Sequence, residues 1–162
     1  MRRASVATLL CALVVSSGQA ALGPMAFPAL VSQAEVIVRG RVESVLPRGQ
    51  SQEGSPARTR EVEYASWYVA VLSVDEVLKG PADLRRIRVE FNSMEDSARY
   101  EPGEAVFSFL AKTGRDDFYT TVGMLQGRYV IRGGMVGRDR IPVAEFVRRI
   151  RDLLRAPDQS GR

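Results

Sequence analysis

Residues Glu35–Val45, which read EVIVRGRVESV, decide the fold class of this protein. Val36, Val38 and Val42 share one parity, and charged side chains occupy most of the positions of the other parity. Because successive side chains of a strand point to opposite faces, this pattern predicts a half-buried β-strand. Gly40 lies inside the strand and predicts a bend or a close approach of two backbones.

Further strand patterns follow the first one and predict a mainly β domain. The longest runs from Val62 to Leu78 and is apolar on both faces, which is typical of a strand that is covered on both sides or closes a barrel. Gly133-Gly134 predicts a tight hairpin back through Met135-Val136. The remaining strands are expected at 84–91, 105–111, 118–122 and 128–132.

The pattern changes to a helical period near the C-terminus. Six apolar residues form one helical stripe, with Pro142 in its first turn: Val143, Phe146, Val147, Ile150, Leu153 and Leu154. We therefore expect a small antiparallel OB-like barrel of six to seven strands, capped by this C-terminal amphipathic helix. An open sandwich is the alternative. The domain is expected at 30–154, with a flexible lead-in at 21–29, a long mobile loop at 46–60 and a disordered tail at 155–162.

The first twenty residues have the pattern of a cleavable signal peptide. Two arginines precede the apolar run Val6–Val15, which is too short to cross a bilayer. Small residues follow the run, so cleavage is expected after Ala20. A lipoprotein site at Cys11 is the alternative, but a bulky leucine precedes that cysteine. The sequence therefore predicts an exported protein, periplasmic or extracellular, with no transmembrane anchor after cleavage.

Composition narrows the chemistry open to the expected mature domain. The chain has no histidine, and its single cysteine, Cys11, lies in the segment expected to be removed. Histidine bases, thiol nucleophiles, zinc–thiolate sites and disulfides are therefore excluded from that domain. The acidic pairs Glu95-Asp96 and Asp116-Asp117 fall in expected loops and fit solvated turns. We predict no catalytic residue, no cofactor and no metal site.

The charge of the chain is modest once the signal segment is set aside. The sequence carries 23 basic and 19 acidic residues, for a net charge of +4. Removal of Arg2 and Arg3 leaves 21 basic and 19 acidic residues, a net charge of +2. Nucleic-acid binders concentrate far more basic charge on one surface, so no nucleic-acid partner is expected.

Five segments carry a resemblance to a known group of proteins: AEVIVRGRV (34–42), VDEVLKG (74–80), EPGEAVFSFL (101–110), QGRYVI (126–131) and VAEFVRRI (143–150). Over roughly residues 30–154 the chain resembles bacterial exported proteins of unknown function, whose OB-like barrel is similar to the netrin-like domain of tissue inhibitors of metalloproteinases. The resemblance implies the fold more than an activity. Inhibitors of that kind chelate the protease zinc through a mature N-terminal cysteine, which this chain lacks, so the mechanism is not carried over.

The segment Gly123–Ile131 is the most distinctive candidate for function. Two glycines bracket polar Gln126 just before a strand, which predicts a strained turn or bulge that aims side chains outward. Gln126, Arg128 and Tyr129 are therefore the candidate partner-binding residues. The leading hypothesis is a non-enzymatic exported binding or inhibitor-like module whose partner is an unidentified protein or envelope component. The alternatives are a carboxylate-dependent hydrolase of envelope polymers and a single-stranded nucleic-acid binder.

Overall fold

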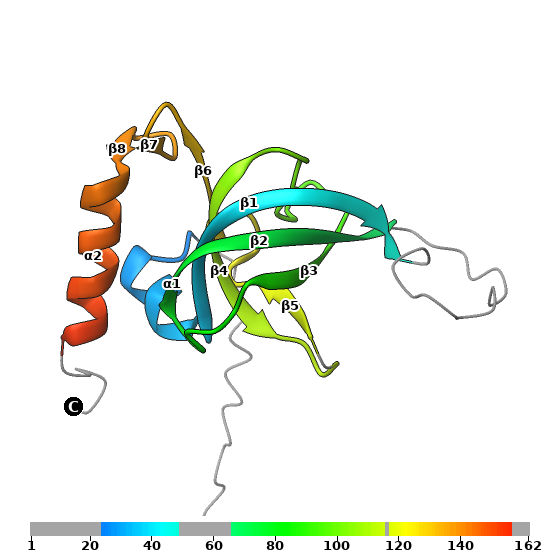
Figure 1. Ribbon diagram of the computed structural model, residues 1–162, viewed down its shortest axis with the longest axis horizontal. Coiled ribbons are helices and arrows are strands. Elements are labelled where there is room, and N and C mark those ends of the chain that lie inside the picture. The colour runs from blue at the N-terminus through cyan, green and yellow to red at the C-terminus, as the bar shows by residue number, and fades with distance from the viewer. Residues whose placement is uncertain (1–23, 49–65, 116, 157–162) are drawn as a thin grey trace, which may run out of the picture.

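The computed structural model describes residues 24–48, 66–115 and 117–156 (Figure 1). The expected signal peptide, with Cys11, and most of the expected loop at 46–60 lie outside these residues. In chain order the elements are α1 (Phe27–Gln33), β1 (Val36–Pro47), β2 (Trp67–Lys79), β3 (Arg86–Asn92), β4 (Ala105–Lys112), β5 (Phe118–Thr121), the 3₁₀ helix η2 (Met124–Gly127), β6 (Arg128–Arg132), β7 (Met135–Val136), β8 (Ile141–Pro142) and α2 (Val143–Arg155).

Five strands close into a barrel in the order β1-β2-β3-β5-β4, and β4 pairs back onto β1. Four of these neighbouring pairs are antiparallel, whereas β3 and β5 run parallel. Parallel neighbours need a crossover connection, and the segment that contains β4 provides it. The arrangement confirms the mainly β, OB-like barrel, with one parallel pair inside an otherwise antiparallel sheet. Strands β6, β7 and β8 extend the sheet beyond β4, so the described residues form eight strands rather than six or seven.

Alternating side chains of β1 and β4 serve two separate cores. Val36 and Val38 belong to the cluster that all five barrel strands enclose, whereas Ile37 between them belongs to a second cluster outside the barrel. Phe107 and Phe109 of β4 join that second cluster. Helices α1 and α2 cover it on one side of the barrel (Figure 1).

The C-terminal helix is confirmed, and it packs against the outer side of the barrel wall. Its buried residues Phe146, Val147 and Ile150 come from the apolar stripe that predicted it. Pro142 is the last residue of β8 and the N-cap of α2, one position before the first helical residue. The helix ends at Arg155, one residue beyond the expected end of the domain.

Gly40 allows β1 to bend and pair with two partners. A Cβ atom at this position would lie 2.1 Å from the carbonyl oxygen of Ser73 on β2, far inside van der Waals contact. The β1–β2 register also shifts between Arg39 and Gly40. Glycines and register shifts are the features that curve strands in small barrels. The predicted close approach of two backbones is therefore confirmed.

The predicted hairpin after β6 is also confirmed. Gly133 and Gly134 have φ angles of +57° and +76°, and β6 and β7 pair antiparallel across them. Positive φ at both central residues is the requirement of a tight type I′ turn. Together with η2, the two strands of this hairpin line the candidate site.

Candidate functional site

A strained turn precedes β6 and presents apolar side chains to solvent. Gly123 and Met124 are consecutive residues with left-handed φ angles of +63° and +56°. Residues with long side chains, such as Met124, rarely adopt this conformation. Backbone strain of this kind costs about 1–3 kcal/mol per residue, and strained residues cluster at functional sites. Met124 and Leu125 are 42% and 51% exposed. The structure thus confirms the predicted strained turn.

The backbone around η2 holds the turn in place. The Leu125 N–H donates a hydrogen bond of 3.2 Å to the carbonyl oxygen of Asp96 in the loop before β4. A Cβ atom at Gly127 would lie 2.1 Å from the carbonyl oxygen of Val122, so this position accepts only glycine. Together these contacts fix where Met124 and Leu125 point.

Gln126 makes an internal contact rather than an outward one. Its Oε1 accepts a hydrogen bond from the backbone N–H of Met25, just before α1. The side chain is half-buried at the edge of the site. The contact of Gln126 with a partner stays a prediction, and within the chain its carbonyl oxygen already accepts a hydrogen bond.

Arg128 lies at the floor of the site and is largely buried. Its guanidinium forms an ion pair with Glu104, and only 16% and 14% of the two side chains are exposed. The same guanidinium sits over the ring of Tyr100, 5.2 Å from its centroid. Arg132 approaches Glu104 at 3.8 Å from the solvent side. The Arg128 Nε is buried and has no hydrogen-bond acceptor among the described residues.

Tyr100 anchors a small polar network beneath Arg128. Its hydroxyl donates to Ser108 Oγ at 3.3 Å and shares a 2.9 Å hydrogen bond with Thr121 Oγ1. Burial raises the pKa of Tyr100 above its usual 10.0, against the opposing effects of these two hydrogen bonds and of the Arg128 charge. Arg128 thus closes a buried network that joins β4, β5 and β6.

Tyr129 belongs both to the outer core and to the site. Its ring packs against Phe27, Phe109 and Phe146, with centroids 6.1, 5.7 and 5.0 Å away. Burial raises the pKa of Tyr129, and the nearby charge of Asp139 raises it further. The ring therefore connects the pocket wall to the helix-covered core.

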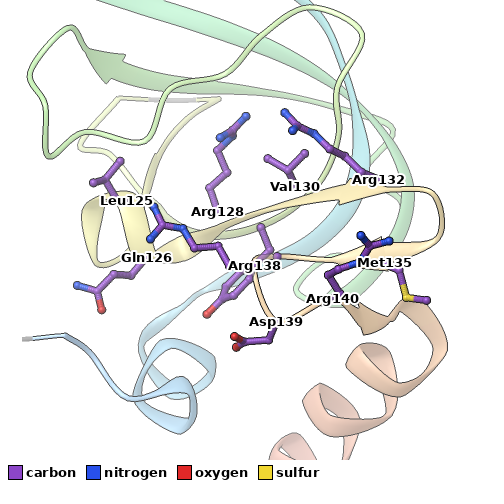
Figure 2. Close-up of a pocket in the computed structure, with 11 residues that line it drawn as sticks. Leu125, Gln126, Arg128, Val130, Arg132, Met135, Arg138, Asp139 and Arg140 are labelled. Carbon is purple, nitrogen blue, oxygen red and sulfur yellow. The ribbon is translucent and has the colours of Figure 1, made fainter.

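A pocket of about 870 Å³ lies beside η2, β6 and β7 and brings the three predicted residues together. Four of its lining side chains are arginines, which Figure 2 labels as Arg128, Arg132, Arg138 and Arg140. Among the described residues, Asp139 is the single acidic one that lines it, whereas the hydrolase alternative requires two acidic side chains. The lining residues are Leu125, Gln126, Arg128, Tyr129, Val130, Arg132, Met135, Gly137, Arg138, Asp139 and Arg140.

Sequence reasoning missed the arginines that carry the accessible charge. Arg138 and Arg140 are exposed, and neither forms an ion pair within the part of the chain that the structure describes. The available signal was the short basic run Gly137–Arg140 after the hairpin, next to the polar turn at Gln126. We call Met124, Leu125, Arg132, Arg138 and Arg140 the turn–pocket surface.

Over 24–48, 66–115 and 117–156, no group of three or more acidic residues is placed to hold a metal ion. Within the same ranges, neither helix has the length and apolar character that a membrane span requires. Comparison with protein-family models and with curated proteins finds no match to this chain.

Proposed function

We propose that the protein is a non-enzymatic, exported binding or inhibitor-like module that holds a protein of the cell envelope at its turn–pocket surface. One observation carries the proposal: a strained turn exposes Met124 and Leu125 at the rim of a pocket surrounded by arginines. Backbone strain and exposed apolar side chains both cost stability, so their joint presence favours a binding role over a packing role.

The chemistry of the surface favours an acidic protein segment with one apolar anchor. Arginine and large apolar side chains are enriched in the centres of protein interfaces. Arg138 and Arg140 offer planar groups of donors that match carboxylates in geometry and charge. Leu125 and Met124 supply the apolar contact beside these donors.

Export rests on the N-terminal sequence and has its own test. The arginines, the apolar run and the small residues up to Ala20 support cleavage by a signal peptidase. Mass spectrometry of the protein in the exported fraction should find an N-terminus at Ala21 or close to it. An intact Met1 in that fraction would contradict the processing step without bearing on the binding surface.

Binding is tested by capture from the native envelope followed by affinity measurements with the captured protein. Leu125→Asp and Arg138→Glu should each weaken the affinity about tenfold or more, because they place a negative charge against an acidic partner. Arg148→Glu is the matched control, since Arg148 is also exposed and lies on α2, away from the pocket lining. These variants avoid Gln126 and Arg128, whose side chains make contacts inside the domain.

The affinity measurements test the surface, and the capture experiment tests the binding role. Loss of affinity in Leu125→Asp and Arg138→Glu, with Arg148→Glu close to the parent, supports the turn–pocket surface. Equal affinity in all three variants rejects this surface. Capture of no specific protein from the envelope rejects the binding role itself.

A further inference from the structure

A second surface lies on the outer side of β2, β3 and β5 and shares no residue with the turn–pocket surface. Strand register aligns Val71, Arg88 and Phe118 in one row across the three strands, and Val69, Glu90 and Thr120 in the next. Trp67 and Asn92 form a third, shorter row. Arg48 after β1 and Arg115 before β5 border these rows. We call this surface the β2–β3–β5 face.

The arginines of this face stack on aromatic rings. The guanidinium carbons of Arg88 and Arg115 lie 5.7 and 5.2 Å from the ring centroid of Phe118. Arg48 lies in the same way over Trp67, at 5.6 Å. Stacking leaves the edge N–H groups of the exposed Arg88 available, and a stacked guanidinium loses little conformational freedom when it binds an anion.

Glu90 fixes two of these arginines from below. Its carboxylate is unusual for the outer side of a barrel, because only 8% of the side chain is exposed. It forms an ion pair with Arg115 and lies 3.6 Å from the Nε of Arg48. Arg88, which is exposed, forms no ion pair with any residue that the structure describes. The face therefore presents preorganised donors, and one of its cations has no carboxylate within the described residues.

We propose that the β2–β3–β5 face binds an acidic polysaccharide. Uronate carboxylates match the guanidinium edges of Arg88 and Arg115. Arg48 stacks over the ring of Trp67, and the part of this residue that stays exposed, 39%, offers apolar surface to a sugar. The exposed Thr120 offers a neutral hydroxyl to the sugar hydroxyls. OB folds often carry ligands on this side of the barrel, a fold-level analogy that does not choose the ligand.

The covered rings favour a polysaccharide over a single-stranded nucleic acid. Non-specific binders of single strands stack successive bases on exposed aromatic faces. Here two guanidiniums lie over the ring of Phe118, so that ring is not an open platform for a base. The experiment therefore also measures binding of a single-stranded nucleic acid as the competing ligand.

Trp67 makes the test direct because it is the only tryptophan of the chain. The full chain is titrated with polygalacturonate in low salt, and tryptophan emission is followed. Affinity electrophoresis in a native gel that contains the same polymer gives a second readout. We expect saturable binding, which Arg88→Gln weakens about tenfold through loss of one charge-assisted contact. Arg148→Gln on α2 should stay within about twofold of the parent, as a matched loss of one exposed arginine.

Three results would overturn the proposal. The first is no binding of polygalacturonate by either readout. The second is equal binding by the parent and by Arg88→Gln. The third is tighter binding of a single-stranded oligothymidylate that Arg88→Gln weakens, which would assign the face to nucleic acid. Circular dichroism checks that Arg88→Gln is folded, since the substitution removes the stacking contact with Phe118 but no ion pair with the described residues.

The two proposals fail independently. Arg138→Glu should leave polygalacturonate binding unchanged, and Arg88→Gln should leave capture of the envelope protein unchanged. A variant that abolishes both activities would contradict the separation of the two surfaces.

Discussion

Replacement of Arg128 tests whether its ion pair with Glu104 stabilises the folded domain. In the substitution Arg128→Met, the new side chain keeps much of the volume and loses the charge. Glu104, only 14% exposed, would then face Arg132 alone, at 3.8 Å and from a side chain that is 83% exposed. The ring of Tyr100 would lose the guanidinium that covers it. We therefore expect a loss of stability even when no partner is present.

The expected loss is about 3 kcal/mol in the free energy of unfolding. Removal of one partner from a fully buried ion pair costs about 3–5 kcal/mol, because the other charge stays buried and uncompensated. The partial exposure of both side chains and the approach of Arg132 reduce this value. Loss of the cation–π contact with Tyr100 adds about 0.5–1 kcal/mol. Together these effects place the cost near the lower end of the buried-pair range.

Urea unfolding followed by far-ultraviolet circular dichroism measures this loss. With a slope of about 2 kcal/mol per molar urea, the midpoint should fall by about 1.5 M. Arg138→Met is the matched control and should change stability by less than about 0.5 kcal/mol, since Arg138 is exposed and forms no ion pair with the described residues.

The double variant Arg128→Met/Glu104→Leu gives an internal check. It should be more stable than Arg128→Met alone, because no buried charge then lacks its partner. A loss below about 1 kcal/mol in Arg128→Met, or no recovery in the double variant, would show that the ion pair does not hold the barrel wall.

Two further predictions concern the barrel. Gly40→Ala should cost about 3 kcal/mol or more in unfolding free energy, because its Cβ atom would meet the carbonyl oxygen of Ser73 at 2.1 Å. Gly114→Ala is its control, with no atom within 4 Å of the added Cβ, and equal stability of the two variants would contradict the predicted clash. Tyr100 has a folded-state pKa raised above 10.0, so the folded chain keeps this proton more tightly than the unfolded chain does. Stability from this group is therefore complete below pH 10 and is lost as the pH rises above it, and Tyr100→Phe should decline less steeply in that range. Parallel stability curves for the parent and Tyr100→Phe in alkaline urea titrations would refute this linkage.

Local patterns predicted most of the elements of the fold. The alternation in Glu35–Val45 predicted β1, the glycine pair at 133–134 predicted the hairpin, and the apolar stripe from Val143 predicted α2. Each of these signals depends on neighbours within a few residues, so it can be read without knowledge of the rest of the chain. Local patterns do not show which strands pair with each other. For example, β3 and β5 pair only after the chain has passed through β4.

The sequence also predicted the local features of the candidate site, because these depend on neighbours along the chain. Gly123 and Gly127 predicted a strained turn, because backbone strain is a local property. The directions in which the side chains of Gln126 and Arg128 point depend on hydrogen-bond and ion-pair partners from other parts of the chain. Met25 is 101 residues from Gln126, and Glu104 is 24 residues from Arg128. The sequence therefore predicted the turn, whereas the contacts of these two side chains within the chain became visible only in the tertiary structure.

The sequence by itself determined the strands, the turns, the terminal helix and the range of chemistry available to a domain without histidine. Tertiary structure alone decided the parallel β3–β5 pair, the second core beneath α1 and α2, and the two arginine surfaces. The physical reason is the range of the interactions involved. Periodicity and φ preferences act within a few residues, whereas burial of Arg128 against Glu104, or of Glu90 beneath Arg115, requires the closed barrel to bring distant charges together.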